Sequence, residues 1–129
     1  MAVTLNHTII QSHDKETSAA FLTELLDLPP PTSFGPFRVV QVGETSLDFV
    51  ETDGEIASRH FAFMVSEDEF DTIFGKITGR GMAHWADPHR EKPDEINTRD
   101  GGRGVYFEDP NGHLLEILTR PYGSGGWNA

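Results

Sequence analysis

Two segments of the chain repeat one pattern of apolar and polar positions. The segment from Leu5 to Val50 opens with strand-like alternation, continues with apolar residues at helical spacing and closes with strand-like runs. The segment from Ser58 to Leu118 does the same. A period of two is typical of a half-buried strand, and a period near 3.6 is typical of an amphipathic helix. An internal repeat of this kind predicts two copies of one structural unit.

The first copy is predicted to be a strand, a helix and a hairpin. Asp14 is a suitable N-cap for the helix, and the three prolines at 29–31 cannot continue it. Gly43 and Glu44 form the turn of the hairpin. The expected elements are a strand over 3–10, a helix that ends near 26, and strands over 37–42 and 45–51.

The second copy has the same order. Ser66 and Glu69 form a capping box, which satisfies the free amides at the start of a helix. The expected elements are strands over 60–65 and 82–86, a helix from 66 to about 79, and a hairpin of 103–108 with 113–119. The polar loop over 87–102 exceeds the roughly 12–15 residues beyond which loops tend to be functional or mobile. We expect it to act as an adjustable cover on a cavity.

The element order β-α-β-β-(β), present twice, predicts an α+β fold with mostly antiparallel sheet. A chain of 129 residues is about one domain in size, so the two copies should share that domain. We expect a single domain over 1–121, made of modules over 1–55 and 58–121, and a flexible tail over 122–129.

Charge and composition narrow the function classes. The net charge of −11 argues against nucleic acid and anionic membrane surfaces as partners. The absence of cysteine excludes disulfides, thiolate zinc sites and cysteine nucleophiles. The N-terminus does not have the pattern of a signal peptide, and the longest apolar run, over 61–65, is too short to span a bilayer. We therefore expect a cytoplasmic protein.

The repeat places four potential metal ligands at equivalent positions. His7 and His60 stand at the start of the two copies, and Asp48 and Glu116 stand near their ends. Imidazole and carboxylate ligands suit a divalent transition metal. A single strand histidine is more often an ordinary core or surface residue, but Glu116 stands between leucines and isoleucines, and a buried charge needs a partner.

Three stretches of the sequence resemble the vicinal oxygen chelate superfamily of glyoxalases, fosfomycin-resistance thiol transferases, extradiol dioxygenases and bleomycin-binding proteins. The sharpest is Gly104-Val-Tyr-Phe-Glu-Asp-Pro-Asn-Gly-His-Leu-Leu-Glu-Ile117. Leu5-Asn6-His7 and His60-Phe61-Ala62-Phe63 also match, and the resemblance extends over about 3–121. It implies that the two modules form a pair of glyoxalase-like half-barrels.

The resemblance implies that His7, His60 and Glu116 hold one divalent ion per site, which is iron, manganese, nickel, cobalt or zinc. Such a set leaves positions open for water and a bidentate oxygen substrate. Asp48 matches a fourth ligand of glyoxalase-like members, but aspartate is shorter than the usual glutamate. It either binds the metal directly or contacts metal-bound water as a catalytic group. Tyr106 either contacts substrate or oxygen, as in relatives, or is an aromatic residue of the barrel wall.

Three further residues on or around the long loop are candidates for substrate binding: His84, Arg99 and Arg103. Basic groups over a metal cavity would suit an anionic or enediolate-forming substrate. The alternative is a solvated polar loop without a binding role. His113 belongs to the Asp-Pro-Asn-Gly-His turn and is expected to order the hairpin there.

The main functional hypothesis is a metal-dependent enzyme that acts on a small oxygen-rich molecule, by lyase or isomerase chemistry or as an oxygenase. The alternative is a non-catalytic protein of the bleomycin-resistance type, whose members generally lack the ligand set. A thiol transferase fits less well, because 96–100 lacks the lysine and serine that such relatives carry before the tyrosine. In many short members the first half of one chain closes against the second half of its partner, so we expect a homodimer.

Overall fold

The computed structural model describes residues 3–121 and divides the chain into two compact units. Within the described residues, one unit comprises 3–57 with 109–112, and the other comprises 58–108 with 113–121. Each unit contains one copy of the sequence repeat. The expected tail over 122–129 lies outside the described residues.

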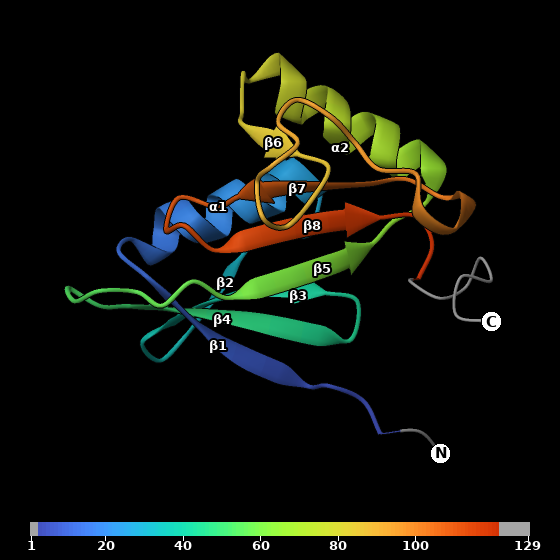
Figure 1. Cartoon of the computed structure of the whole chain (residues 1–129). Helices are drawn as coiled ribbons and strands as arrows, with labels where there is room; N and C mark the ends of the chain where they lie inside the picture. The colour runs from blue at the N-terminus through green and yellow to red at the C-terminus, as the bar shows by residue number, and fades with distance from the viewer. Residues whose placement is uncertain (1–2, 122–129) are drawn as a thin grey trace. The chain divides into compact units, whose positions relative to one another are not determined.

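The first unit is a four-stranded sheet with one helix (Figure 1). The strand order is β1-β4-β3-β2, in which β1 and β4 are parallel and the other neighbours are antiparallel. The elements are β1 (His7–Ser12), α1 (Lys15–Leu26), β2 (Thr32–Phe34), β3 (Phe37–Val42) and β4 (Thr45–Glu51).

Helix α1 begins at the predicted cap. The Asp14 carboxylate accepts the Thr17 backbone N–H at 3.0 Å, and the helix ends at Asp27 in a left-handed conformation. Its side chains Ala19, Leu22 and Leu25 are buried. The helix contacts β1, β3 and β4 and so covers one face of the sheet.

A turn from the second sequence copy is part of the first unit. Asn111 accepts the His13 backbone N–H at 3.0 Å and donates to the Ser18 hydroxyl at 2.9 Å. Gly112 closes this turn with φ of +85°, which glycine adopts without a steric cost. The Asp109–Gly112 turn therefore has a structural role in the opposite copy.

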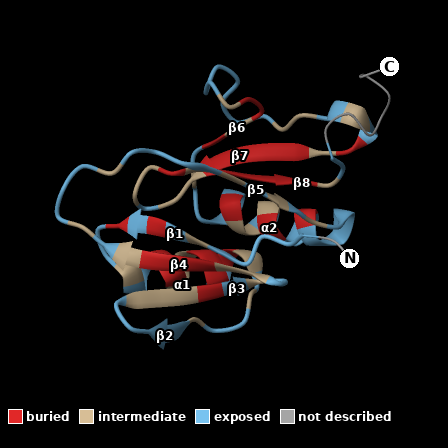
Figure 2. Cartoon of the chain, turned by 90° about the horizontal axis from the view of Figure 1, so that it is seen from below, coloured by how far each residue is buried: buried red, intermediate tan, exposed pale blue. Residues whose placement is uncertain are grey.

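The second unit has the same architecture, with strand order β5-β8-β7-β6 and a parallel β5–β8 pair. Helix α2 starts with the predicted capping box of Ser66 and Glu69 and buries Phe70, Ile73 and Ile77. Figure 2 shows β7 and β8 as largely buried strands. The elements are β5 (His60–Met64), α2 (Glu67–Gly79), β6 (His84–Trp85), η1 (Arg99–Gly101), β7 (Gly104–Glu108) and β8 (Leu114–Leu118).

The predicted α+β class and the two-copy architecture are confirmed. Several details differ from the sequence prediction: the strand predicted over 82–86 is only His84–Trp85, and the long loop contains η1. The first strand begins at His7, later than predicted, and the short β2 was not predicted because its residues Thr32–Phe34 are exposed and directly follow the prolines. No helix within 3–121 is long and apolar enough to cross a bilayer.

Candidate metal site

Strand alternation places the predicted ligands of the second unit on the sheet face opposite to α2. His60 and Ala62 share that face of β5, and the register pairs Ala62 with Glu116 on β8. Phe61 and Phe63 point the other way. His60 and Met64 are exposed, so β5 presents an open face next to Glu116.

His60 and Glu116 point their ligand atoms at one another. His60 Nε2 lies 3.1 Å from Glu116 Oε1, and His60 Nδ1 lies 3.0 Å from the Leu114 carbonyl oxygen. A carbonyl oxygen only accepts, so Nδ1 donates its proton there and Nε2 of the neutral ring presents its lone pair. A carboxylate oxygen then faces this lone pair. A cation bound by both atoms would relieve the repulsion between the lone pair and the carboxylate.

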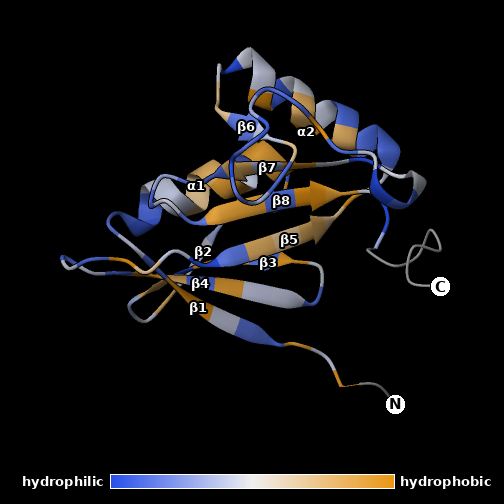
Figure 3. Cartoon of the chain, viewed as in Figure 1, coloured by the Kyte–Doolittle hydropathy of each residue, from blue (hydrophilic) through white to orange (hydrophobic). Residues whose placement is uncertain are grey.

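The Glu116 carboxylate is almost completely withdrawn from solvent. Its exposed fraction is 1%, whereas the His60 side chain is 47% exposed. Figure 3 shows the corresponding hydrophilic stretch within the otherwise hydrophobic β8. A buried carboxylate is costly unless cations or hydrogen-bond donors compensate it, which favours a functional role for Glu116.

The first unit presents a second histidine and carboxylate in the same register. Asp48 pairs with Ile9, two residues after His7, just as Glu116 pairs with Ala62, two residues after His60. His7 Nδ1 lies 2.7 Å from the Asn6 side-chain oxygen, so its Nε2 is also presented as a lone pair. Asp48 is 9% exposed and accepts the Ser46 hydroxyl proton at 3.0 Å. The structural repeat thus holds both histidines in one tautomer.

His7 and Asp48 line a cavity of about 500 Å³ in the first unit. Its apolar wall includes Ile9, Phe34 and Phe37, of which Phe34 is 75% exposed. Phe34 and Phe37 pair across the β2–β3 hairpin. The sequence indicates a turn at Gly35-Pro36 between two phenylalanines. The prolines at 29–31 precede this turn and made a strand at β2 hard to predict.

Tyr106 lies on the open face of the second unit, opposite Glu116 in the β7–β8 register. Its ring stacks on His60, with centroids 5.8 Å apart and an interplanar angle of 24°. Trp85 pairs with Tyr106 in the β6–β7 register and therefore shares that face. The sequence does not predict this position, because the face that a residue of a two-residue strand occupies depends on the register.

Two of the predicted substrate-binding residues lie on the α2 side of the sheet and are removed from the candidate site. His84 is buried against Phe74 of α2, with ring centroids 5.3 Å apart. Arg103 binds Glu67 and Asp71 of α2 at 2.8 Å each and lies over the Phe70 ring. Hydrogen bonds with Asp71 and Glu67 raise the pKa of Arg103. Both residues stabilise helix–sheet packing.

Arg99, the third predicted substrate-binding residue, lines a separate cavity in the loop between β6 and β7. His113 is buried, and its Nδ1 accepts the Arg59 backbone N–H at 3.0 Å. It therefore orders the hairpin, as expected, and lies away from the open face.

The donor atoms of the second unit fit part of a divalent-metal site. Ligand atoms at about 2.0–2.2 Å from an ion lie about 3 Å apart when adjacent, close to the observed His60–Glu116 separation of 3.1 Å. The carbonyl bonded to His60 is an outer partner of the kind that orients metal-binding histidines. Within residues 3–121, no group of three or more histidine, aspartate or glutamate side chains converges as a ligand set. Each unit supplies one histidine and one carboxylate.

Comparisons with known proteins give a consistent assignment. The family model described as "Glyoxalase/Bleomycin resistance protein/Dioxygenase superfamily" matches residues 4–117. The solved structure of oxidase ChaP-H2 is 57% identical and superposes with a TM-score of 0.94, covering 98% of this chain and 100% of that one. Oxidase ChaP-H1 is 58% identical, with a TM-score of 0.92 and coverage of 95% and 99%.

A curated relative carries a different activity. Metallothiol transferase FosB from Lysinibacillus sphaericus (strain C3-41) is 26% identical over 129 residues, which cover 89% of this chain and 81% of that protein. The family match extends over most of the chain and includes His7, His60 and Glu116. The protein therefore belongs to the glyoxalase/bleomycin resistance protein/dioxygenase superfamily.

Proposed function

We propose that the protein is a metal-dependent enzyme that oxidises a small oxygen-bearing molecule with dioxygen. The observation that carries the metal centre is the His60–Glu116 pair, in which a nitrogen lone pair and a buried carboxylate oxygen face each other at 3.1 Å. His7, His60 and Glu116 would hold the ion. A bound divalent ion supplies Lewis acidity and, if it is iron, a site for dioxygen activation.

The choice of oxidation rests on the relatives. The two solved oxidases share 57–58% of their residues with this chain over nearly their whole length, whereas the metallothiol transferase shares 26%. In the simplest balance, the substrate loses two electrons and two protons, and dioxygen takes them up as hydrogen peroxide. Insertion of oxygen into the substrate is the oxygenase variant of the same chemistry.

Side chains of this protein would bind the substrate and move protons. The apolar wall of the first-unit cavity would hold the body of the substrate and exclude water. Asp48 lines that cavity and has one oxygen available beside the Ser46 hydroxyl, which suits a general base for a substrate hydroxyl. Tyr106 is 2% exposed and stacks on His60, so it would position the His60 ring.

Oxygen uptake tests this proposal. Purified protein loaded separately with Fe(II), Mn(II), Co(II), Ni(II) or Zn(II) is assayed against vicinal diols and hydroxyketones. We expect uptake with a redox-active ion, and we expect it to disappear in Glu116→Gln while Glu108→Gln retains it. Glu108 is a matched control because it lies on β7, on the same sheet face as Glu116, and forms a salt bridge with Arg90. Uptake that survives Glu116→Gln contradicts the proposal, as does transfer of a thiol to fosfomycin without any oxygen uptake.

A further inference from the structure

The loop between β6 and β7 begins with a short arm, residues 86–93, that folds back on itself. The Ala86 N–H donates to the Lys92 carbonyl at 3.0 Å. Trp85 and Pro93 form an antiparallel β-bridge at the base of the arm. The two sides of the arm are therefore held together by backbone contacts like those of a hairpin.

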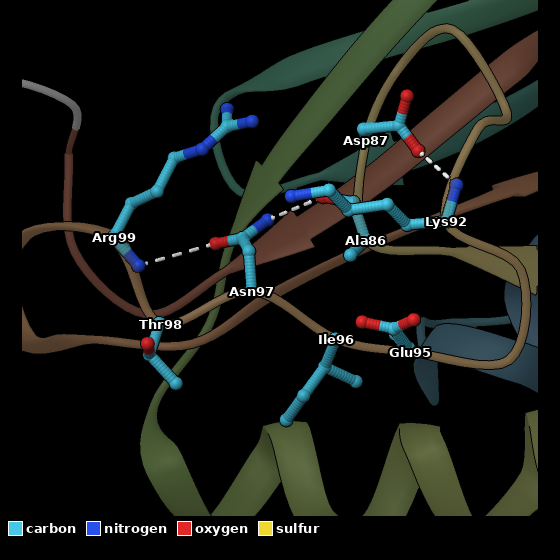
Figure 4. A pocket seen from close by; sticks show the side chains of 8 residues that line it. All are labelled: Ala86, Asp87, Lys92, Glu95, Ile96, Asn97, Thr98 and Arg99. Atoms are coloured by element: carbon cyan, nitrogen blue, oxygen red, sulfur yellow. Dashed lines mark hydrogen bonds between the residues drawn. The ribbon is translucent and has the colours of Figure 1, made fainter.

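The tip of the arm is braced by the Asp87 carboxylate. This group accepts the backbone N–H groups of His89, Glu91 and Lys92 at 2.8–3.2 Å, and Figure 4 shows its bond to Lys92. Burial of Asp87 opposes its charged form, but these hydrogen bonds outweigh that effect and lower its pKa. The arm is therefore a preformed unit that can move without losing its own hydrogen bonds.

The loop is fastened to the sheet at Asn97, beyond the arm. The backbone groups of Asn97 and Gly104 form two hydrogen bonds of 2.8 and 3.0 Å, and the Asn97 side-chain amide donates to the Ala86 carbonyl at 2.9 Å (Figure 4). A Cβ atom at Gly104 would lie 3.0 Å from both the nitrogen and the oxygen of that amide. Gly104 is two residues from Tyr106 on β7, so this Cβ would point to the face of Tyr106 and Glu116. Asn97 therefore lies on the face that carries the proposed metal ligands.

The arm is fastened to the same face a second time, by Arg90 at its tip. The Nε and Nη2 atoms of Arg90 each lie 2.7 Å from Glu108 Oε2, and its guanidinium lies over the Trp85 ring, 5.3 Å from the centroid. Glu108 is two residues after Tyr106 on β7, and Trp85 pairs with Tyr106. Both partners of Arg90 therefore share the face of Tyr106.

Tyr106 lies between the two fastening points. Gly104 precedes it by two residues on β7 and Glu108 follows it by two, so the loop is attached to the sheet on both sides of its ring. Tyr106 is on the face opposite to α2 and is nevertheless only 2% exposed. On the same face, His60 and Met64 of β5 are exposed. This face of the sheet is therefore covered at Tyr106 and open at β5.

The two fastening points differ in how easily they break. Asn97 is held by a pair of backbone hydrogen bonds to the first residue of β7 and by its side-chain amide. Arg90 is held by side-chain contacts alone among those described above, and the side chains of Arg90 and Glu108 are each 39% exposed. Exposed ion pairs and exposed cation–π contacts are weak. The arm should therefore come away from the sheet at Arg90 while Asn97 stays in place.

We propose that residues 86–93 are a lid over Tyr106, hinged at Asn97 and latched by the contacts of Arg90 with Glu108 and Trp85. Opening of the lid would uncover the Tyr106 side of the face that carries His60 and Glu116. The inference rests on the proposed function only for the identity of the molecule that enters. The latch supplies no metal ligand, so its loss should leave the equilibrium metal content unchanged.

Hydroxyl-radical footprinting of the full chain, stripped of metal, tests the lid, because labelling of the Tyr106 ring measures its exposure to solvent. At low salt, Arg90→Gln should raise Tyr106 labelling by roughly fivefold, the combined effect of an exposed ion pair and an exposed cation–π contact. Lys92→Gln removes the same charge from the same arm, where residue 92 contributes backbone hydrogen bonds, and should label like the wild type. Phe107 is 0% exposed, so its unchanged labelling verifies that each variant is folded.

Salt tests the latch without any substitution. A salt concentration of about 1 M screens the exposed Arg90–Glu108 pair, so Tyr106 labelling should rise in the wild type and change little in Arg90→Gln. Equal Tyr106 labelling of wild type and Arg90→Gln at low salt overturns the latch, as does an equal rise in Lys92→Gln. If Arg90→Gln is unfolded, a wild type whose labelling does not respond to salt overturns it. A latch that behaves as expected in a protein without oxygen uptake would count against the proposed function alone.

Discussion

At the scale of single residues, the two histidines show how much the sequence could predict. The repeat placed His7 and His60 at equivalent positions, and in the structure each Nδ1 faces an oxygen acceptor, which favours the tautomer that presents Nε2. The tautomer itself was not predictable, because it depends on an Asn6 side chain in one unit and on the Leu114 backbone in the other. Only folding brings Leu114 next to His60.

Asp48 and Glu116 differ in whether the carboxylate contacts the histidine of its own unit. Glu116 lies within hydrogen-bond distance of His60, whereas no hydrogen bond joins Asp48 to His7 in the described part of the chain. We therefore predict that Asp48→Asn retains its metal and loses oxygen uptake by about 10²- to 10⁴-fold, the usual contribution of a general base. Metal analysis and oxygen uptake on one preparation measure both effects. A strong loss of metal in Asp48→Asn, but not in Glu44→Gln, would instead make Asp48 a direct ligand.

At the scale of elements, the register decided which side chains reach the site. His84 and Trp85 are neighbours in β6, and only Trp85 shares the face of Tyr106. Arg103 precedes β7 and packs against α2. The sequence identified each of these strands, but a register shift of one residue exchanges the two faces. The face of the sheet that each of these side chains occupies could therefore be determined only from the structure.

Gly104 offers a test of the contact between loop and sheet. Gly104→Ala should destabilise the protein by about 1–3 kcal/mol, as other overpacked sites do, because its methyl group would press on the Asn97 amide. Gly75→Ala is the control: its Cβ has open space on α2, and alanine there should be neutral or stabilising by about 0.5–1 kcal/mol. Urea denaturation measures both. Equal stability of Gly104→Ala and wild type would show that Asn97 moves away freely.

The loop should also respond to acid through Asp87. Because hydrogen bonding lowers the pKa of Asp87 in the folded protein, its contribution to stability is present above about pH 4 and is lost as the pH falls through the folded value. Protection of the Glu91 and Lys92 amides, measured relative to their intrinsic exchange rates, should fall over that range. In Asp87→Asn these amides should exchange faster than wild type already at pH 7. Unchanged protection there would mean that the carboxylate does not hold the loop.

At the scale of the whole molecule, each unit supplies one histidine and one carboxylate, and we predict that a homodimer completes the sites. If His7 of one chain joins His60 and Glu116 of its partner, mixing His7→Ala with Glu116→Ala chains restores one of the two sites in each heterodimer. Mass spectrometry identifies the heterodimer, and metal analysis measures its content. If heterodimers form but bind no metal, the three ligands of each site come from one chain.

The most direct test of a metal centre formed by His7, His60 and Glu116 is the metal content of purified protein after loading with a divalent ion and removal of the excess. We predict one ion per chain in the wild type and in Glu108→Gln. We predict almost none in Glu116→Gln, which removes the buried charge but keeps the size of the side chain. Equal metal content in Glu116→Gln and wild type, with both proteins folded by circular dichroism, would contradict this assignment.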